Sequence, residues 1–394
     1  MPRYLVVFGT RPEAIKMAPV LQALEEDPQA TSIACCTGQH QDLLAPILSL
    51  FRIHPQYNLR VMSVNQQLSA LTSLLLPQLE KILLAERPDR VLVQGDTTTA
   101  MVAAMAASYQ KIPVAHVEAG VRSHNPLEPF PEEMNRKIID ALADLFFAPT
   151  QVERNDLLRE GIHPSKIHVT GNTSIDALRH IASQPFSIQG SALEGLPLMD
   201  KRIILTTVHR RENHGLPLIN ICAAIRKIAQ IYRNTAHIVI PVHPNPNVKA
   251  CVHRCLGGVP NITLTPPLGY KEIVALAQCA FFALTDSGGL QEELTWLGKP
   301  ALVLRNVTDR REAIDAGAAK LVGVDPQVIV ASAIELMENA AIYRRMAQCR
   351  ELFGDGTAAR KIARILHQHH ARSQEPSAIV TPEVTQAPPF SEAA

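Results

Sequence analysis

Short runs of Val, Ile and Leu alternate with longer stretches of helical composition through the first part of the chain. The runs lack alternating polar residues, a pattern typical of parallel strands that are buried on both faces of a sheet. They cover residues 4–8, 32–36, 90–93, 113–117, 145–148 and 166–169. The pattern predicts a doubly wound α/β domain over residues 1–171.

The pattern breaks at residues 183–200, where prolines and glycines indicate a linker. Apolar runs then resume at residues 202–208, 237–242, 280–284 and 301–304. A chain of 394 residues is longer than one hydrophobic core usually supports. We therefore expect a second α/β domain over residues 172–356, with room for a cleft between the two.

The end of the chain divides into two parts. Thr357 is a candidate N-cap for a helical pattern that reaches about His370. Residues 373–394 carry Pro, Ser, Thr and Ala with little apolar content, which predicts a disordered tail.

Charge and composition narrow the possible partners. Lys and Arg number 38 and Asp and Glu 37, so the chain has no overall field that would attract a polyanion, and nucleic acid is not an expected partner. The first apolar run is followed by charged residues rather than a cleavage site, so we interpret it as a strand and not a signal peptide. No segment approaches the ~20 continuous apolar residues that span a bilayer. We expect no membrane partner and a cytoplasmic protein.

The seven cysteines are an odd number with scattered spacing, which favours reduced thiols in the cytoplasm. Cys251 and Cys255 would share one helix face beside His253. There is no second ligand pair at zinc spacing, so ordinary helix residues are the favoured interpretation and no metal site is predicted.

Ligands of open parallel sheets bind beyond the carboxyl ends of the strands, so polar residues at strand ends are the site candidates. The first strand ends in GTRPE, directly before a helix. The exposed N–H groups of this turn, together with Arg11, would form a phosphate pocket. A capped turn with a surface arginine is the alternative.

Three acidic residues, Asp96, Glu118 and Glu132, follow strand ends or open the next helix and can converge on one cleft rim. A carboxyl group in a partly dry cleft has a raised pKa, which suits proton transfer near neutral pH. Two structural alternatives remain. Asp96 is also placed to cap the helix that follows it. The three acids could instead pair with three cations, Arg122, Arg136 and Lys137.

In the second half, the strand ending at residue 208 is followed by His209, Arg210 and Arg211. These residues suit anion binding and proton transfer, and a solvated charged loop is the alternative. His243 ends the next strand within a loop that nearby prolines stiffen. Tyr270 precedes a helix and could frame a nucleobase.

The segment TDSGGLQEE lies between a buried strand and a helix. Its Ser287, Gly288 and Gly289 would let the backbone approach a diphosphate at the helix N-terminus. Glu293 lies one turn into the helix and can accept hydrogen bonds from ribose hydroxyls. A glycine turn with surface acids is the alternative. Residues 305–312 form either another phosphate-facing segment or a surface loop.

Nine motifs together resemble the non-hydrolysing UDP-N-acetylglucosamine 2-epimerase family over about residues 3–360. In chain order they read GTRPEAIKMAP, TGQH, GDTTT, HVEAGVRS, FPEEMNR, GNTSID, VHRREN, HPNP and DSGGLQEE. The resemblance implies two Rossmann-like domains facing across a cleft, the GT-B arrangement. It also implies that the C-terminal helix, at about residues 357–370, crosses back to the first domain.

The resemblance further assigns roles to individual residues. The implied catalytic residues are Asp96, Glu118, Glu132 and His209. The implied nucleotide-binding residues are Arg11, His243, Ser287, Gly288, Gly289 and Glu293. Some family members bind a second UDP-N-acetylglucosamine as an activator, through positions that here are Gln39, His40 and Arg211. The chain departs from the family at Gln41 and Asp42, which puts this activation in doubt.

The chemistry of the substrate constrains the mechanism. The hydrogen at C2 has no neighbouring carbonyl, so its direct removal would leave an unstabilised carbanion. Breaking the bond between C1 and UDP gives C1 oxocarbenium character and acidifies the C2 proton. We expect elimination to 2-acetamidoglucal, then re-addition of UDP with the proton returned to the opposite face. No cofactor or metal is expected, because the dinucleotide fingerprint is absent and arginines can neutralise the diphosphate.

Three other functions remain open. A GT-B glycosyltransferase would share the diphosphate turn but needs an acceptor groove and only one base. A hydrolysing epimerase would release free N-acetylmannosamine and UDP. A regulatory protein would bind the UDP-sugar without turnover.

The family resemblance also implies a homodimer.

Overall fold

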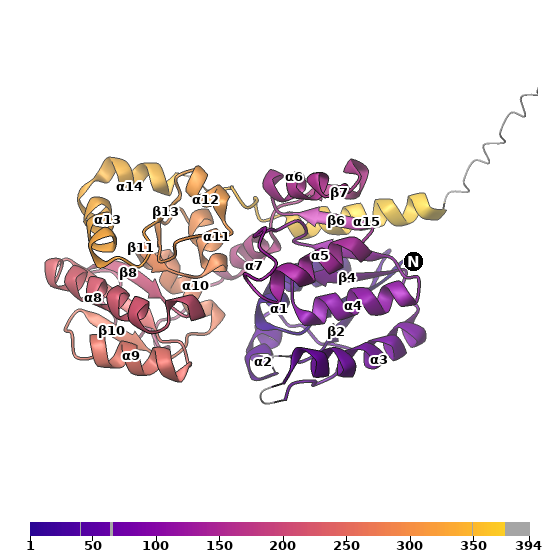
Figure 1. The fold of residues 1–394 in the computed structure, drawn as a ribbon, viewed down its shortest axis with the longest axis horizontal. Helices are drawn as coiled ribbons and strands as arrows, with labels where there is room; N and C mark the ends of the chain where they lie inside the picture. Colours follow the sequence, from indigo (N-terminus) through magenta and orange to yellow (C-terminus); the bar gives the residue numbers. More distant parts are fainter. Residues whose placement is uncertain (40, 64–65, 349, 375–394) are drawn as a thin grey trace, which may run out of the picture.

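The protein folds into two parallel α/β domains, seen side by side in Figure 1. The structure is a computed structural model and describes residues 1–39, 41–63, 66–348 and 350–374. One domain holds a seven-stranded sheet of order β3-β2-β1-β4-β5-β6-β7. The other holds a six-stranded sheet of order β10-β9-β8-β11-β12-β13. The predicted pair of Rossmann-like domains is confirmed.

The first domain surrounds its sheet with helices on both faces. Its strands are β1 (Arg3–Phe8), β2 (Thr31–Cys36), β3 (Tyr57–Asn58), β4 (Arg90–Gln94), β5 (Val114–Val117), β6 (Leu145–Ala148) and β7 (Ile167–Val169). Its helices are α1 (Arg11–Glu25), α2 (Gln41–Leu50), α3 (Leu68–Glu86), α4 (Thr98–Tyr109), α5 (Glu132–Leu142), α6 (Gln151–Arg159), the 3-10 turn η1 (Pro164–Lys166) and α7 (Thr173–Ala182). Strands β1 and β4–β6 are buried almost throughout, as continuous apolar runs require.

The second domain repeats this architecture. Its strands are β8 (Arg202–Thr207), β9 (Ala236–Pro241), β10 (Ile262–Thr265), β11 (Ala280–Thr285), β12 (Ala301–Val303) and β13 (Ala319–Leu321). Its helical segments are η2 (Arg211–Asn213), α8 (Leu216–Ile231), α9 (Pro246–Leu256), α10 (Tyr270–Cys279), α11 (Gly288–Trp296), α12 (Arg311–Asp315), α13 (Pro326–Glu338) and α14 (Ala340–Ala347). A final helix, α15, covers Ala358–Gln374.

All ten predicted strands are present, and three strands were missed. The missed strands β3, β10 and β13 all lie at sheet edges. An edge strand is paired on one side only and is shorter or more polar, so it lacks the apolar run that marks a central strand. Strand β3 has two residues, and β13 carries an exposed lysine.

Helix α15 returns to the first domain, as the resemblance implied. Figure 1 shows it lying along that domain, and its apolar residues pack into the core beside α1 and α7. Thr357 directly precedes the helix, as predicted, but another side chain takes the first N–H groups. Thr357 Oγ1 donates to Asp355, whereas the N–H groups of Ala358 and Ala359 donate to Asp176 Oδ2 and Oδ1 at 3.1 and 2.9 Å. The helix also extends past His370, and residues 375–394 of the predicted tail lie outside the described residues.

Helix α7 lies at the junction of the domains, where it contacts α1 and α15 on one side and α10 and α11 on the other. The predicted boundary between residues 171 and 172 therefore stays a prediction.

Among the described residues, one helix, α3, is long and apolar enough to cross a membrane. It packs against α4 and places five side chains in the core: Leu71, Leu75, Leu79, Ile82 and Leu83.

Candidate functional site

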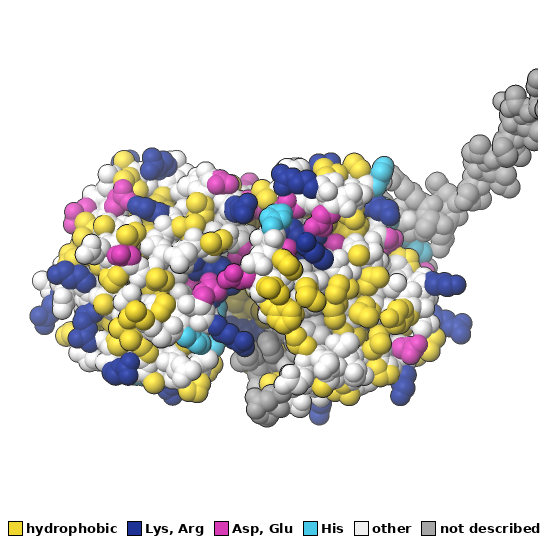
Figure 2. All heavy atoms as spheres, viewed as in Figure 1, with side chains coloured by type: hydrophobic (Ala, Val, Ile, Leu, Met, Phe, Trp, Pro, Cys, Tyr) yellow, Lys and Arg dark blue, Asp and Glu magenta, His cyan; other side chains and the backbone are white. Residues whose placement is uncertain are grey.

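A cleft of about 740 Å³ lies between the two domains, beyond the carboxyl ends of both sheets. In Figure 2 charged and histidine side chains gather around the hollow between the domains. The structure brings most of the predicted site residues to this cleft. Its lining includes Gln39, Asp96, Glu118, Glu132, His209, Arg211, Ser287, Gly288 and Gly289.

Asp96 follows β4 and meets the first turn of α5. Its Oδ2 accepts from Arg136 Nε at 2.9 Å, and its backbone carbonyl accepts from Asn135 Nδ2 at 2.8 Å. The helix-capping alternative is wrong, because Thr97 Oγ1 accepts from the N–H of Ala100 and caps α4 instead. Asp96 is thus held by one arginine and keeps an exposed face on the cleft.

The alternative that the three acids pair with Arg122, Arg136 and Lys137 holds for one pair only among the described ion pairs. Arg136 pairs with Asp96 and also donates to Glu133 at 2.9 Å. Arg122 pairs with Asp140 and Glu160 instead, behind the cleft. The three acids therefore do not share the predicted set of cations.

Glu118 follows β5 in a left-handed backbone conformation, with φ +64°. A non-glycine residue held there is strained, and such strain is common at functional sites. Its buried carboxylate accepts from Gln94 Nε2 at 2.5 Å and forms ion pairs with Lys16 and Arg310. The surrounding structure therefore fixes the position of this carboxylate on two sides.

The expectation of a raised pKa is wrong for Glu118. Burial raises the pKa of this carboxyl, but the cations Lys16 and Arg310 more than offset it and hold the pKa below its ordinary value. Lys16 comes from α1, and Arg310 comes from the second domain. Glu118 is therefore ionised at neutral pH.

Glu132 opens α5 and lines the cleft. Its Oε2 is buried and has no hydrogen-bond partner among the described residues. Leaving such an oxygen without a partner costs about 1–3 kcal/mol. Glu133, next along the chain, accepts instead from the N–H groups of Ser123 and His124 at 2.9 and 3.2 Å. Glu132 is therefore the acid of this pair that keeps a carboxyl oxygen without a partner among the described residues.

His209 is positioned by Asp286, a residue of the glycine-rich segment without a predicted role. Asp286 is fully buried, and its Oδ1 lies 3.1 Å from His209 Nδ1. Its Oδ2 accepts from the N–H groups of His209 and Arg210 at 3.0 and 2.9 Å, and from Asn213 Nδ2 at 2.9 Å. The pairing of Thr285 with Thr207 between β11 and β8 places the two segments together. This register was not known from the sequence.

Burial lowers the pKa of His209, although the charge of Asp286 opposes this shift. The imidazole is therefore neutral at neutral pH. With Nδ1 held by Asp286, Nε2 is left for a ligand. His243 stacks on the His209 ring with centroids 5.7 Å apart and planes 26° apart, and burial also lowers the pKa of His243.

Arg11, Tyr270 and Glu293 form a second group beside the cleft. Tyr270 OH donates to Glu293 Oε1 at 2.9 Å, and Arg11 lies close enough to influence both groups electrostatically. Burial raises the pKa of Glu293 to about 7. This group joins α1 of the first domain to α10 and α11 of the second.

The prediction that the turn after β1 forms a phosphate pocket is wrong for two of its N–H groups. Glu13 Oε2 accepts from the N–H groups of Gly9 and Thr10 at 3.0 and 2.8 Å, so those groups are not free for a phosphate. Arg11 is half-buried rather than on the surface. The turn is capped, and its arginine still faces the neighbouring domain.

The glycine-rich turn forms the N-terminus of α11. Ser287 caps the helix by accepting from the N–H of Leu290 at 3.4 Å. A Cβ added at Gly289 would meet no atom within 4 Å, so the space in front of the helix is open. Arg210 lies beside Gly288. An open helix N-terminus next to an arginine suits an anion such as a diphosphate.

The resemblance implies that Gln39, His40 and Arg211 bind a second UDP-sugar, and the structure describes two of these three residues. Gln39 lines the cleft, and its Oε1 accepts from Thr99 Oγ1 at 2.9 Å. Arg211 lines the same cleft. His40 and the side chains of Gln41 and Asp42 lie outside the described residues. The activator role of these positions stays a prediction.

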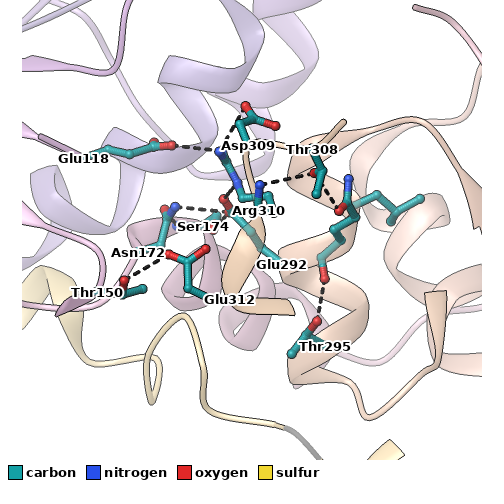
Figure 3. A network of polar contacts seen from close by, with 12 residues as sticks. Glu118, Thr150, Asn172, Ser174, Glu292, Thr295, Thr308, Asp309, Arg310 and Glu312 are labelled. Atoms are coloured by element: carbon teal, nitrogen blue, oxygen red, sulfur yellow. Dashed lines mark hydrogen bonds and ion pairs between the residues drawn. The ribbon is translucent and has the colours of Figure 1, made fainter. Parts of the chain in front are cut away.

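Arg310 links the domains behind Glu118, as Figure 3 shows. Its guanidinium is buried and pairs with Glu292, with Asp309 at 3.2 Å and with Glu118 at 3.4 Å. Asn172 and Ser174 donate to Glu292 at 3.1 and 2.8 Å. Arg310 also lines the cleft and is buried, so the surface-loop interpretation is wrong for this residue, and its role as a phosphate-facing arginine stays a prediction.

Comparison with known proteins relates this site to one family. A family model described as UDP-N-acetylglucosamine 2-epimerase matches residues 22–367. The chain is 46% identical over 367 residues to a putative UDP-N-acetylglucosamine 2-epimerase of Clostridium acetobutylicum, covering 93% of this chain and 95% of that protein. It is 45% identical over 372 residues to the UDP-N-acetylglucosamine 2-epimerase of Salmonella typhimurium, covering 93% and 99%.

A solved structure agrees with these matches. The fold is similar to the crystal structure of the Neisseria meningitidis UDP-GlcNAc 2-epimerase bound to UDP-GlcNAc. The TM-score is 0.88 at 43% sequence identity, covering 93% of this chain and 100% of that chain.

The link between Asp286 and His209 predicts the behaviour of a variant. In Asp286→Asn the ring loses a negative charge that favours the imidazolium, so the pKa of His209 falls further. NMR of labelled histidine measures this titration. Asp200→Asn, at an exposed position of the linker, serves as the control and leaves it unchanged. An unchanged His209 titration in Asp286→Asn contradicts the assigned contact.

Proposed function

Since the chain belongs to the UDP-N-acetylglucosamine 2-epimerase family, we propose that it interconverts UDP-N-acetylglucosamine and UDP-N-acetylmannosamine without hydrolysis. One observation carries the proposal. Carboxylates of the first domain line one cleft together with His209 and the open N-terminus of α11 from the second domain. Inverting C2 needs a site for the departing diphosphate and proton-transfer groups around one sugar ring.

The departing UDP is proposed to bind at the second domain. Its diphosphate faces the N–H groups of Gly288 and Gly289, beside Arg210. The bound diphosphate adds negative charge beside His209 and favours its imidazolium, which Asp286 stabilises through Nδ1. As the bond from C1 to UDP breaks, Nε2 of this imidazolium donates its proton to the departing phosphate, and it takes the proton back when UDP re-adds. Each such donor contributes roughly 10²–10³ in rate. Arginines neutralise the diphosphate, so the proposal needs no metal or cofactor.

The proton at C2 is proposed to pass through the carboxylates of the first domain. Asp96 and Glu118 are the proton-transfer groups, and Glu132 supports them with its free Oε2. Glu118 enters the cycle as a carboxylate, because Lys16 and Arg310 keep it ionised. General acid–base catalysis of this kind contributes roughly 10²–10⁴ in rate. Exclusion of water by the two domains protects the 2-acetamidoglucal intermediate.

The nucleoside is proposed to bind beside this centre. Glu293 accepts hydrogen bonds from the ribose hydroxyls, and Tyr270 frames the base. Arg11 and His243 complete the nucleotide site. Gln39, His40 and Arg211 are the proposed contacts of a second, activating UDP-sugar.

The cytoplasm is the proposed location of the protein. Its proposed partners are the UDP-sugar and a second copy of the chain, and neither nucleic acid nor a membrane is proposed as a partner.

Helices α3 and α4 expose Leu68, Leu74, Leu84 and Tyr109, with 41–65% of each residue accessible. Figure 2 shows apolar side chains gathered on the face of the first domain where α3, α4 and α5 lie. This face is the proposed homodimer interface.

Proton NMR in deuterated water tests the reaction. Incubation with UDP-N-acetylglucosamine is expected to give deuterium at C2 and intact UDP-N-acetylmannosamine. Asp96→Asn removes one proton-transfer group and is expected to lower the exchange rate at least ~10²-fold, with UDP binding retained. Asp200→Asn is the control and exchanges at the wild-type rate.

Three outcomes of this experiment contradict the proposal. Free N-acetylmannosamine with UDP indicates a hydrolysing enzyme. Binding without exchange at C2 indicates a regulatory protein. Sugar transfer that requires an acceptor indicates a glycosyltransferase.

The dimer is tested by analytical ultracentrifugation. The wild-type protein is expected to sediment at twice the chain mass of 43.1 kDa. Leu74→Glu places a charge on the exposed face of α3 and is expected to weaken association at least tenfold. Val328→Glu, on α13 of the second domain, is the matched control and stays dimeric. A wild-type monomer, or a dimer that resists Leu74→Glu, contradicts the assigned interface.

A further inference from the structure

Three cysteines from two helices of the second domain meet away from the cleft. Cys222 belongs to α8, and Cys251 and Cys255 belong to α9. Their Sγ atoms all lie within 4.8 Å of one another. The sequence showed only the pair on α9 and favoured ordinary helix residues. The third thiol comes from a helix that no spacing rule connects to that pair.

We propose that these three thiols form a binding site for a thiophilic metal cation. A zinc-like ion binds thiolate sulfur at about 2.3 Å, so three sulfurs arranged around it in a plane lie about 4 Å apart. The triad is within a small side-chain adjustment of that geometry. On binding, each Sγ–H releases its proton to water and a metal–sulfur bond forms, with no change of oxidation state.

The surroundings of the triad select for soft ions. Cys222 and Cys251 are buried within the apolar core beneath α8 and α9. Hard cations such as Mg²⁺ prefer oxygen ligands, which the triad does not offer. The triad therefore favours an ion that binds sulfur strongly.

A cavity of about 430 Å³ gives access to the triad. It is lined by Cys251 together with residues of the loop before α8, including His214 and Gly215. His214 Nε2 is buried and has no hydrogen-bond partner among the described residues. The cavity therefore offers an ion a route to the sulfur atoms and a nitrogen donor along it.

Metal binding at the triad would join two helices that begin at the candidate active site. Helix α8 starts after the segment that carries His209, and α9 starts after the loop that carries His243. An ion held by both helices adds a cross-link to the folded state alone. It is therefore expected to raise the thermal stability of the protein.

Titration of the reduced, tag-free full chain with Cd²⁺ tests the site. The expected result is one ion per chain, with ultraviolet thiolate-to-metal charge-transfer absorption and a raised Tm. Cys222→Ser and Cys251→Ser each remove one sulfur at nearly constant volume and are expected to weaken binding at least tenfold. Cys279→Ser is the matched control, because Cys279 is an exposed thiol on α10 outside the triad, and it leaves binding unchanged.

A second measurement does not depend on the folding of the variants. In the wild-type protein, Cd²⁺ is expected to protect three cysteines from alkylation, and mass spectrometry of the peptides identifies them. Protection of Cys279 alone, or charge-transfer absorption that survives in folded Cys222→Ser, overturns the proposal. A disulfide between triad members in the protein as purified would also overturn it.

Discussion

The buried guanidinium of Arg310 is the interaction on which the arrangement of the cleft depends. It is a second-domain cation placed between Glu118 of the first domain and two acids of its own domain, Glu292 and Asp309. Removing one partner from a buried ionic group typically costs about 3–5 kcal/mol, because the remaining charges are left uncompensated. The contact therefore fixes the two domains relative to each other at the point where the acids meet the glycine-rich turn of α11.

The same contact sets the chemistry of Glu118. A carboxylate with this degree of burial would have a raised pKa, but Arg310 and Lys16 reverse the direction. The residue is also held in a left-handed backbone conformation. His209 is held in a similar way in the second domain. Asp286 contacts one nitrogen of its ring and accepts from two backbone N–H groups of the same loop. In both cases a buried charged group positions a side chain that lines the cleft.

The family and the architecture could be predicted from the sequence, and both are confirmed. Central strands are buried on both faces, so their apolar runs identify them, whereas the edge strands β3, β10 and β13 leave no such signal. The rule that ligands bind beyond parallel strand ends also identified the acids and His209 that the structure places at one cleft. The catalytic roles of these residues stay predictions.

The errors have two physical causes. Some are short-range caps that take the place of the predicted contact, and others are contacts between distant segments that decide local chemistry. Thr97 caps α4 in place of Asp96, and Glu13 takes the N–H groups of Gly9 and Thr10. The ionisation of Glu118 and the support of His209 depend on pairings between strands or domains. Short-range patterns carry no record of these pairings.

The most direct test of this account is the titration of Glu118, followed by carboxyl carbon-13 NMR in the wild-type protein and in Arg310→Met. Arg305→Met is the control, because Arg305 pairs with Glu212 and Asp309. The account predicts that Glu118 takes up a proton at higher pH in Arg310→Met, while Arg305→Met titrates as the wild type does. A Glu118 titration that is unchanged by Arg310→Met would contradict it.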